Sequence, residues 1–324
     1  MDASARAYRV GTFSIQCNAG ICGLLDIHFH VGYFISVKYS PMVEQLIELK
    51  TPSGAELYCD LRFGGDGSKA LAGKLPAIIV CHGFKAYKDW GPFPAIGRHF
   101  ANAGFVSFVF NFSHNGIGRD YRKFSEHKKF FNNTISLELE DVETVLSAIV
   151  GGQIDNEFID VSRIGIVGHS RGGGVAILKA SEETRIKAVA GWSTISHFDR
   201  YTERQRNRWR TQGYLGTSSE SSQSPFKVGT ALLDDLEGNV ERFNIERAVS
   251  RLEKPLLLIH GTSDFPVPID EANRLYAISD KTMTEYVVLE GVGHMYGARH
   301  PYREPAPVMN HVLELTSAWF HKHL

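Results

Sequence analysis

The chain has 324 residues, of which 43% are hydrophobic and 22% are charged, and its formal net charge is −1. This composition is that of a soluble globular protein, and the balanced charge leaves no basic surface of the kind that binds nucleic acid. The length exceeds that of most compact domains, but α/β folds often run past 200 residues.

The first 41 residues are expected to form an atypical extension ahead of a main domain over residues 42–324, with an extra strand at 33–38. The stretch 12–37 is fairly apolar, lacks Lys and Arg, and follows two arginines, as a signal peptide does. Polar residues interrupt its apolar core, so neither a signal peptide nor a membrane span is expected: Gln16, Asn18, Asp26, His28 and His30. A cytoplasmic protein is therefore expected, with secretion as the less favoured alternative.

Cysteine usage points away from disulfides and metals. Cys59 and Cys81 fall in predicted strands, and neither is expected in a disulfide framework. Cys17 and Cys22 lie near two histidines, but their spacing fits no standard zinc site. No metal and no cofactor are expected.

Alternation of apolar and polar residues predicts a β-hairpin of 44–50 and 55–63 around Thr51-Pro52-Ser53-Gly54. Strand and helix patterns then alternate, which predicts an α/β fold with a mostly parallel, eight-stranded-type sheet and helices on both faces. Strands are expected at 75–81, 105–110, 164–167, 186–192, 255–261 and 284–289. Helices are expected at 93–103, 137–150, 175–180 and 308–323. In the second of these helices, Glu138, Glu140, Asp141 and Glu143 are expected to favour the helix dipole.

The run Gly168-His169-Ser170-Arg171-Gly172 lies between a predicted strand and a predicted helix. Gly-x-Ser-x-Gly in that context predicts a nucleophile elbow, a sharp turn that lifts a serine hydroxyl out of the sheet. The serine holds a strained backbone, so the residues two before and two after it must be small, as Gly168 and Gly172 are. Ser170 is therefore the candidate nucleophile.

Two further residues follow the last predicted strands. Asp264 lies just past the strand 255–261, and His294 follows the strand 284–289. The carboxyl ends of parallel strands meet at one sheet edge, where sites form in open α/β sheets. The order Ser170, Asp264, His294 is the Ser…Asp…His order of a catalytic triad.

Acyl transfer also needs two N–H groups directed at the developing oxyanion. The backbone N–H of Arg171, directly after the nucleophile, is one candidate. The backbone N–H of Phe84 is the other, because Gly83 allows its loop to approach closely. His82 is expected to hold this loop by hydrogen bonds rather than to act as a base.

Together, His82-Gly83-Phe84, the elbow, Asp264 and His294 resemble the α/β-hydrolase superfamily, and more narrowly its bacterial dienelactone-hydrolase-like and cinnamoyl (feruloyl) esterase-type members. The resemblance extends from about residue 43 to the C-terminus. It implies a serine esterase that acts through an acyl-enzyme on a small-molecule ester, and the serine at the nucleophile position differs from the cysteine of a dienelactone hydrolase proper. Relatives often carry Asp-x-x-Gly-x-Gly after the fourth strand; residues 111–118 keep the glycines without the acid, which leaves the support of that loop open.

About 60 residues separate the strand 186–192 from the next strand, far more than a connection needs. By resemblance, residues 197–254 form a small helical cap after the sixth strand that governs substrate selectivity. It includes a Ser-rich stretch, 218–224, and a helical stretch, 230–252. The five arginines between Arg200 and Arg210 are expected on a solvated helix face rather than in steering an anionic substrate.

Several alternatives stay open. A thioesterase or a carbon–carbon-bond hydrolase fits every residue named. A serine peptidase related to prolyl oligopeptidase would use the same triad, but such enzymes generally carry a propeller domain for which the chain offers no room. A hydrolase-like receptor is disfavoured by the intact triad and oxyanion loop. Four aromatic residues would suit an aromatic acyl group, although core packing explains them equally well: Phe84, Trp90, Trp192 and Trp209. Whether the chain forms a homodimer is also left open.

Overall fold

The computed structural model of the protein describes residues 24–28, 34–38, 42–64, 73–120, 123–154, 157–217, 226–304 and 306–324. The chain divides into two units, residues 1–41 and 42–324. In the first unit, β1 (Leu24–His28) pairs antiparallel with β2 (Phe34–Lys38), which corresponds to the extra strand expected at 33–38. Cys17, Cys22 and most of the apolar stretch 12–37 lie outside the described residues.

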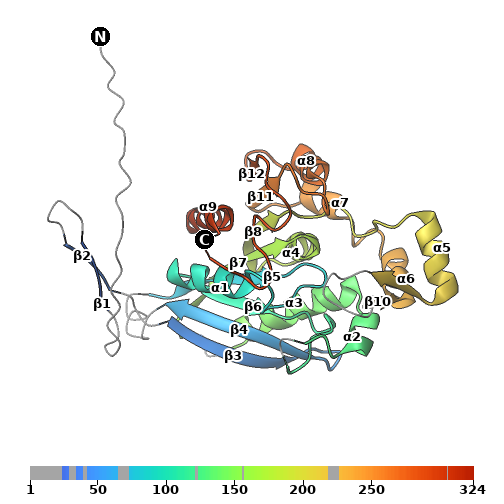
Figure 1. The fold of residues 1–324 in the computed structure, drawn as a ribbon, viewed down its shortest axis with the longest axis horizontal. Helices are drawn as coiled ribbons and strands as arrows, with labels where there is room; N and C mark the ends of the chain where they lie inside the picture. The colour runs from blue at the N-terminus through green and yellow to red at the C-terminus, as the bar shows by residue number, and fades with distance from the viewer. Residues whose placement is uncertain are drawn as a thin grey trace, which may run out of the picture. The chain divides into compact units, whose positions relative to one another are not determined.

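The second unit is built on an eight-stranded sheet (Figure 1). Its strands are β3 (Met42–Lys50), β4 (Glu56–Gly64), β5 (Leu75–Cys81), β6 (Val106–Phe110), β7 (Ile159–His169), β8 (Ile186–Trp192), β11 (Leu256–Gly261) and β12 (Thr284–Leu289). They lie in the order β12-β11-β8-β7-β5-β6-β4-β3. The strands from β12 to β6 are parallel, whereas β4 and β3 form the expected antiparallel hairpin at one edge. The predicted fold class is confirmed.

Helices cover both faces of this sheet. They are α1 (Phe93–Asn102), α2 (His127–Phe131), α3 (Ile135–Val150), α4 (Arg171–Glu182), α5 (Glu203–Gln212), α6 (Thr230–Gly238), α7 (Ile245–Ser250), α8 (Ile269–Ile278) and α9 (Pro307–His323). Figure 1 shows α1 and α9 on one side of the sheet and α3 and α4 on the other. None of the helices in the described part of the chain is long and apolar enough to cross a bilayer.

The central strands are apolar on both sides because each face of the sheet has its own core. In β5, Ile78 and Val80 belong to the cluster that α1 and α9 cover. Ala77, Ile79 and Cys81 belong to the cluster on the opposite face, under α3, α4 and α7. Successive side chains of a strand point to opposite faces, so a strand covered on both sides has an almost continuous apolar sequence.

The insert between β8 and β11 differs from its prediction. The helical stretch expected at 230–252 is two helices, because α6 ends at Gly238 and the side chain of Asn244 caps α7 by accepting a hydrogen bond from Arg247 N at 2.9 Å. Glycine is a poor helix former and asparagine a good N-cap, so the chain breaks between them. The insert also contains the strands β9 (Tyr214–Thr217) and β10 (Phe226–Gly229), paired antiparallel. The Ser-rich stretch 218–224 lies outside the described residues.

Candidate active site

Ser170 sits at the junction of β7 and α4 with φ 58° and ψ −121°. A positive φ is uncommon for a residue with a side chain and marks the strained turn expected here. The flanking glycines are required by packing: a Cβ on Gly168 would lie 2.1 Å from Gly172 O, and one on Gly172 would lie 2.4 Å from His82 O. The sequence therefore predicted the local geometry correctly.

Asp264 and His294 come together from the loops after β11 and β12. Nδ1 of His294 lies 2.8 Å from Oδ2 of Asp264, a hydrogen-bond distance. Two more contacts fix the carboxylate: Val267 N donates to Oδ1 at 2.9 Å, and Nε2 of His260 lies 3.3 Å from Oδ2. A buried carboxylate held in this way can orient an imidazole in one tautomer.

The environment keeps Asp264 ionised. Burial alone would raise the pKa of this carboxyl, but hydrogen bonds from His260, His294 and Val267 outweigh it, and the pKa lies well below its ordinary value. The stability that Asp264 contributes is therefore present above pH 4 and is lost only as the pH falls through the lowered pKa.

His169 holds the loop that carries His294. Its Nε2 lies 2.9 Å from the backbone carbonyl of His294, and the centroids of the two rings are 4.6 Å apart. Burial lowers the pKa of His169 to about 3, so the ring is neutral at pH 7 and its Nε2–H donates to that carbonyl. His169 is part of the elbow motif, but its contact with His294, 125 residues away in the sequence, could be found only from the fold.

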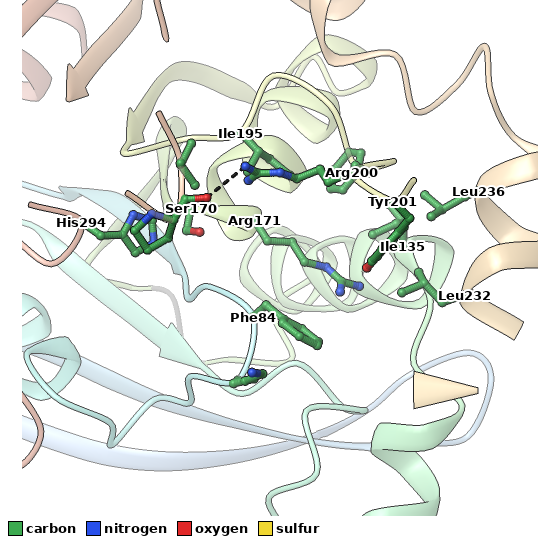
Figure 2. Close-up of a pocket in the computed structure, with 14 residues that line it drawn as sticks. Phe84, Ile135, Ser170, Arg171, Ile195, Arg200, Tyr201, Leu232, Leu236 and His294 are labelled. Carbon is green, nitrogen blue, oxygen red and sulfur yellow. Dashed lines mark hydrogen bonds between the residues drawn. The ribbon is translucent and has the colours of Figure 1, made fainter. Parts of the chain in front are cut away.

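A cavity of about 330 Å³ opens at this edge of the sheet (Figure 2). It is lined by Phe84, Lys85, Ile135, Ser170, Arg171, Ile195, Phe198, Arg200, Tyr201, Leu232, Leu236, Pro266, Val267 and His294. Four of the five residues predicted for the site thus share one cavity, and Asp264 lies buried behind His294. The volume lies at the lower end of the range for small-molecule sites.

The loop expected to supply an oxyanion donor lies against the elbow. A Cβ on Gly83 would be 3.2 Å from Ser170 Cβ, so the backbone approaches the serine as closely as glycine allows. Phe84 follows directly and lines the cavity. Arg171 is the first residue of α4, and the first amide groups of a helix have no carbonyl partner within it. Both predicted backbone donors therefore flank Ser170.

His82 holds the loop that carries Phe84 by hydrogen bonds, as expected from the sequence. Phe112 N donates to its Nε2 at 3.2 Å, so the ring proton is on Nδ1, which donates to Gly83 O at 2.9 Å. Burial lowers the pKa of His82 to about 4, which keeps the ring neutral. Asn115 also contacts Nε2, at 3.3 Å.

The loop after β6 lacks the acid common in relatives, but an acid from α3, Asp141, contacts it. Oδ2 of Asp141 accepts hydrogen bonds from Ser113 N at 2.8 Å and from Ser113 Oγ at 3.1 Å. Of the four acids expected to favour the dipole of α3, Glu138 alone lies in the first turn, and the expectation is wrong for Glu140, Asp141 and Glu143, which lie beyond it. The side chain of Asp141 is also buried. Burial raises the pKa of this carboxyl to about 8.

The insert after β8 supplies part of the cavity wall. Phe198, Arg200 and Tyr201 come from its beginning, and two leucines come from α6. Glu271 on α8 fixes the first segment, since it accepts from Ser196 N at 2.8 Å and pairs with Arg200 at 2.7 Å. Figure 2 shows Arg200 at this wall, where it also donates to Pro266 O at 3.0 Å.

Three of the four arginines of α5 are exposed, as expected, whereas Arg206 is half-buried and pairs with Asp199. Arg204 and Arg208 are exposed, and Arg210 pairs with Glu237 at 2.6 Å on the surface. Arg200 differs because it precedes α5 and lines the cavity.

Of the four aromatic residues suited to an acyl group, Phe84 alone lines this cavity. Trp192 is buried in the sheet core and donates to Thr316, Trp209 packs on Tyr201, and Trp90 stacks on His300. The core-packing interpretation holds for Trp192 and Trp209, which are buried.

The sequence profile of the prolyl oligopeptidase family matches residues 98–324. An uncharacterised 31.7 kDa protein from the traX-finO intergenic region of Escherichia coli is 22% identical over 284 residues, which cover 78% of this chain and 92% of that protein. The fold resembles the dienelactone hydrolase of Anabaena variabilis, with a TM-score of 0.57 and 15% identity over 87% of this chain and 99% of that one. It also resembles the esterase domain of a Rhodothermus marinus protein, with a TM-score of 0.55 and 18% identity over 87% and 99% of the two chains.

Proposed function

Because the chain belongs to the prolyl oligopeptidase family and is an α/β-hydrolase, we propose that it is a serine esterase with Ser170, His294 and Asp264 as its triad. The observation that carries this proposal is the shared cavity of Ser170 and His294, with Asp264 hydrogen-bonded to His294 from behind. Three residues far apart in sequence, one of them a serine with a strained backbone, meet at one sheet edge. Surface residues without a catalytic role have no reason to converge in this way.

In the proposed reaction, Ser170 Oγ attacks the ester carbonyl while His294 accepts the hydroxyl proton. Asp264 holds the imidazole through the 2.8 Å contact and stabilises its charged form. The backbone N–H groups of Phe84 and Arg171 stabilise the tetrahedral oxyanion, each by about 3 kcal/mol. His294 then protonates the leaving alcohol, and water hydrolyses the acyl-enzyme by the reverse sequence.

The cavity favours a small acyl group. Its volume is about 330 Å³, and most of its wall consists of aliphatic and aromatic side chains from the sheet edge and the insert. We propose that residues 197–254 act as the cap that sets acyl selectivity, since residues before and after the segment 218–225 of this insert line the cavity.

A peptidase is the second candidate, and the match to the prolyl oligopeptidase family is the observation that favours it. The same nucleophile, base and oxyanion donors would attack a peptide carbonyl. The two functions differ in the leaving group, an alcohol or an amine.

A matched pair of substrates separates the two candidates. The wild type and Ser170→Ala are assayed on the p-nitrophenyl ester and the p-nitroanilide of the same acyl group, with acyl chains from acetyl to lauroyl. The esterase proposal expects rapid release of p-nitrophenol that Ser170→Ala abolishes, with little cleavage of the anilide. Comparable or faster anilide cleavage would favour the peptidase, and folded wild type without activity on either series would contradict both.

A further inference from the structure

The side chain of Arg171 has no part in the proposed mechanism, which uses only the backbone N–H of this residue. Arg171 is buried, with 9% of its surface exposed, yet it lines the cavity that holds Ser170. Figure 2 shows its guanidinium extending from the elbow into the region between Phe84, Ile135 and Tyr201. A cation so placed needs a partner of opposite charge or an acceptor.

Glu138 on α3 is the protein's partner for this guanidinium. Nε of Arg171 donates to Oε2 at 3.1 Å, and Nη2 lies 2.9 Å from Oε1. The second contact is too poorly aligned for a hydrogen bond, so Nη2 is buried without an acceptor among the described residues. Glu138 also accepts from Asn133 at 2.8 Å. Since a guanidinium has five N–H donors, Arg171 retains donor capacity that the protein does not use.

The charges around the cavity are one-sided. Three cations line it, Lys85, Arg171 and Arg200, whereas the lining in the described part of the chain includes no Asp or Glu. The Nζ of Lys85 lies 5.7 Å and the Cζ of Arg171 lies 5.1 Å from the centre of the Phe84 ring, so both cations adjoin one aromatic side chain. Glu138 and Glu271 pair with the two arginines from outside the lining.

Most of the remaining wall near Arg171 is apolar, with Ile135, Leu232 and Leu236 along it, and the phenol side chain of Tyr201 completes it. A ligand that extends from Ser170 towards Arg171 therefore passes apolar side chains and ends at the guanidinium of Arg171, which lines the cavity and donates one hydrogen bond, to Glu138. A methyl terminus would leave the unused N–H donors of this group without an acceptor, which costs free energy, whereas an oxygen would satisfy one of them.

We propose that Arg171 selects esters whose acyl chain is apolar next to the carbonyl and ends in an oxygen acceptor. This inference rests on the proposed function, because it takes Ser170 as the atom that receives the acyl group. The acceptor is a carboxylate or a neutral ether or hydroxyl oxygen. A guanidinium binds a carboxylate more strongly than a neutral oxygen, so half-esters of dicarboxylic acids rank first and neutral acceptors second.

The test compares p-nitrophenyl hexanoate, p-nitrophenyl 6-methoxyhexanoate and mono-p-nitrophenyl adipate, whose acyl chains end in a methyl group, an ether and a carboxylate. Two further sets of esters carry the same three end groups on acyl chains that are two carbons shorter or two carbons longer. For the best chain length, the wild type should show a kcat/KM about 10- to 100-fold higher for the adipate-type ester than for the plain ester. The ether should lie between them, and an ether equal to the carboxylate would identify recognition of the oxygen rather than of its charge.

In Arg171→Met, the ratio of acceptor-ended to plain ester should fall to about one. The ratio cancels any general effect of the substitution on the elbow. Because the single variant leaves Glu138 buried without its cation, the double variant Arg171→Met with Glu138→Gln serves if the single variant does not fold. Arg208→Met, on the exposed side of α5, is the matched control and should retain the wild-type ratio.

Two results would overturn the inference while leaving the esterase intact: a wild type that hydrolyses all three esters equally, or a preference that survives in Arg171→Met. Arg171 would then be a structural partner of Glu138. A folded wild type that hydrolyses none of the esters would overturn the proposed function and this inference with it.

Discussion

At the scale of single residues, Ser170 stands out because its backbone is strained. A positive φ costs a non-glycine residue about 1–3 kcal/mol and persists only where the surroundings impose it. Here Ser170 N donates to Trp192 O at 2.9 Å, and Ser170 O accepts from Gly173 N at 3.0 Å. The strain presents the hydroxyl to the cavity, which is what the proposed nucleophile requires.

Asp264 gives the sharpest prediction at this scale. In Asp264→Asn the acceptor for Val267 N can remain, but the amide no longer selects the imidazole tautomer that accepts a proton at Nε2. Turnover should fall by about 10⁴-fold while the fold is kept. Steady-state ester hydrolysis together with far-UV circular dichroism checks this. A loss below tenfold would show that Asp264 is no part of the machinery.

At the scale of elements, the junction of β7 and α4 leaves no space for side chains beside the nucleophile. Gly168→Ala would bring a methyl group against the carbonyl of Gly172, which is backbone and cannot rotate away. We expect a loss of about 3 kcal/mol in the free energy of unfolding, with most of the activity lost. Gly238→Ala, where a Cβ meets nothing within 4 Å, is the control and should leave urea unfolding almost unchanged. Equal behaviour of the two variants would contradict this packing.

The contact between α3 and the loop after β6 makes stability depend on pH. The pKa of Asp141 in the folded state is about 8, above its ordinary 3.8, so the folded protein holds this proton more tightly than the unfolded chain does. The contribution of Asp141 to stability is therefore largest below about pH 4 and falls as the pH rises towards 8. Asparagine mimics the neutral carboxyl and accepts from Ser113.

The free energy of unfolding of Asp141→Asn, relative to that of the wild type, should therefore rise by roughly 2–4 kcal/mol from pH 5 to pH 8. Urea unfolding of both proteins at the two pH values measures this difference. Asp141→Ala, which removes the acceptor, should weaken the Ser113 loop and reduce ester hydrolysis at both pH values. A constant difference between wild type and Asp141→Asn would show that the carboxyl is ionised in the folded protein.

At the scale of the whole molecule, the sequence predicted what lies close to a strand end. Ser170, Asp264 and His294 each follow a parallel strand, so their meeting at one edge follows from topology alone. Contacts between distant segments could not be predicted in this way. Glu138 and Asp141 fit a helix-dipole pattern, and only packing shows that they pair with Arg171 and Ser113.

The structure of the insert also depends on contacts that the sequence did not predict. Its length predicted an excursion of the chain, but the break between α6 and α7 depends on Gly238 and the Asn244 cap. Its contribution to the cavity wall depends on Glu271, which comes from α8, beyond the insert. Such contacts have no period or spacing in the sequence, so the local patterns did not reveal them.

The proposed mechanism depends most directly on the activation of Ser170 as a nucleophile. The most direct measurement is labelling of the folded protein with a fluorophosphonate, followed by mass spectrometry of the labelled peptide. An activated Ser170 should carry the one adduct, which should form slowly in Asp264→Asn and be absent in Ser170→Ala. A folded wild type that stays unlabelled, or that carries the adduct on another residue, would contradict the proposed mechanism.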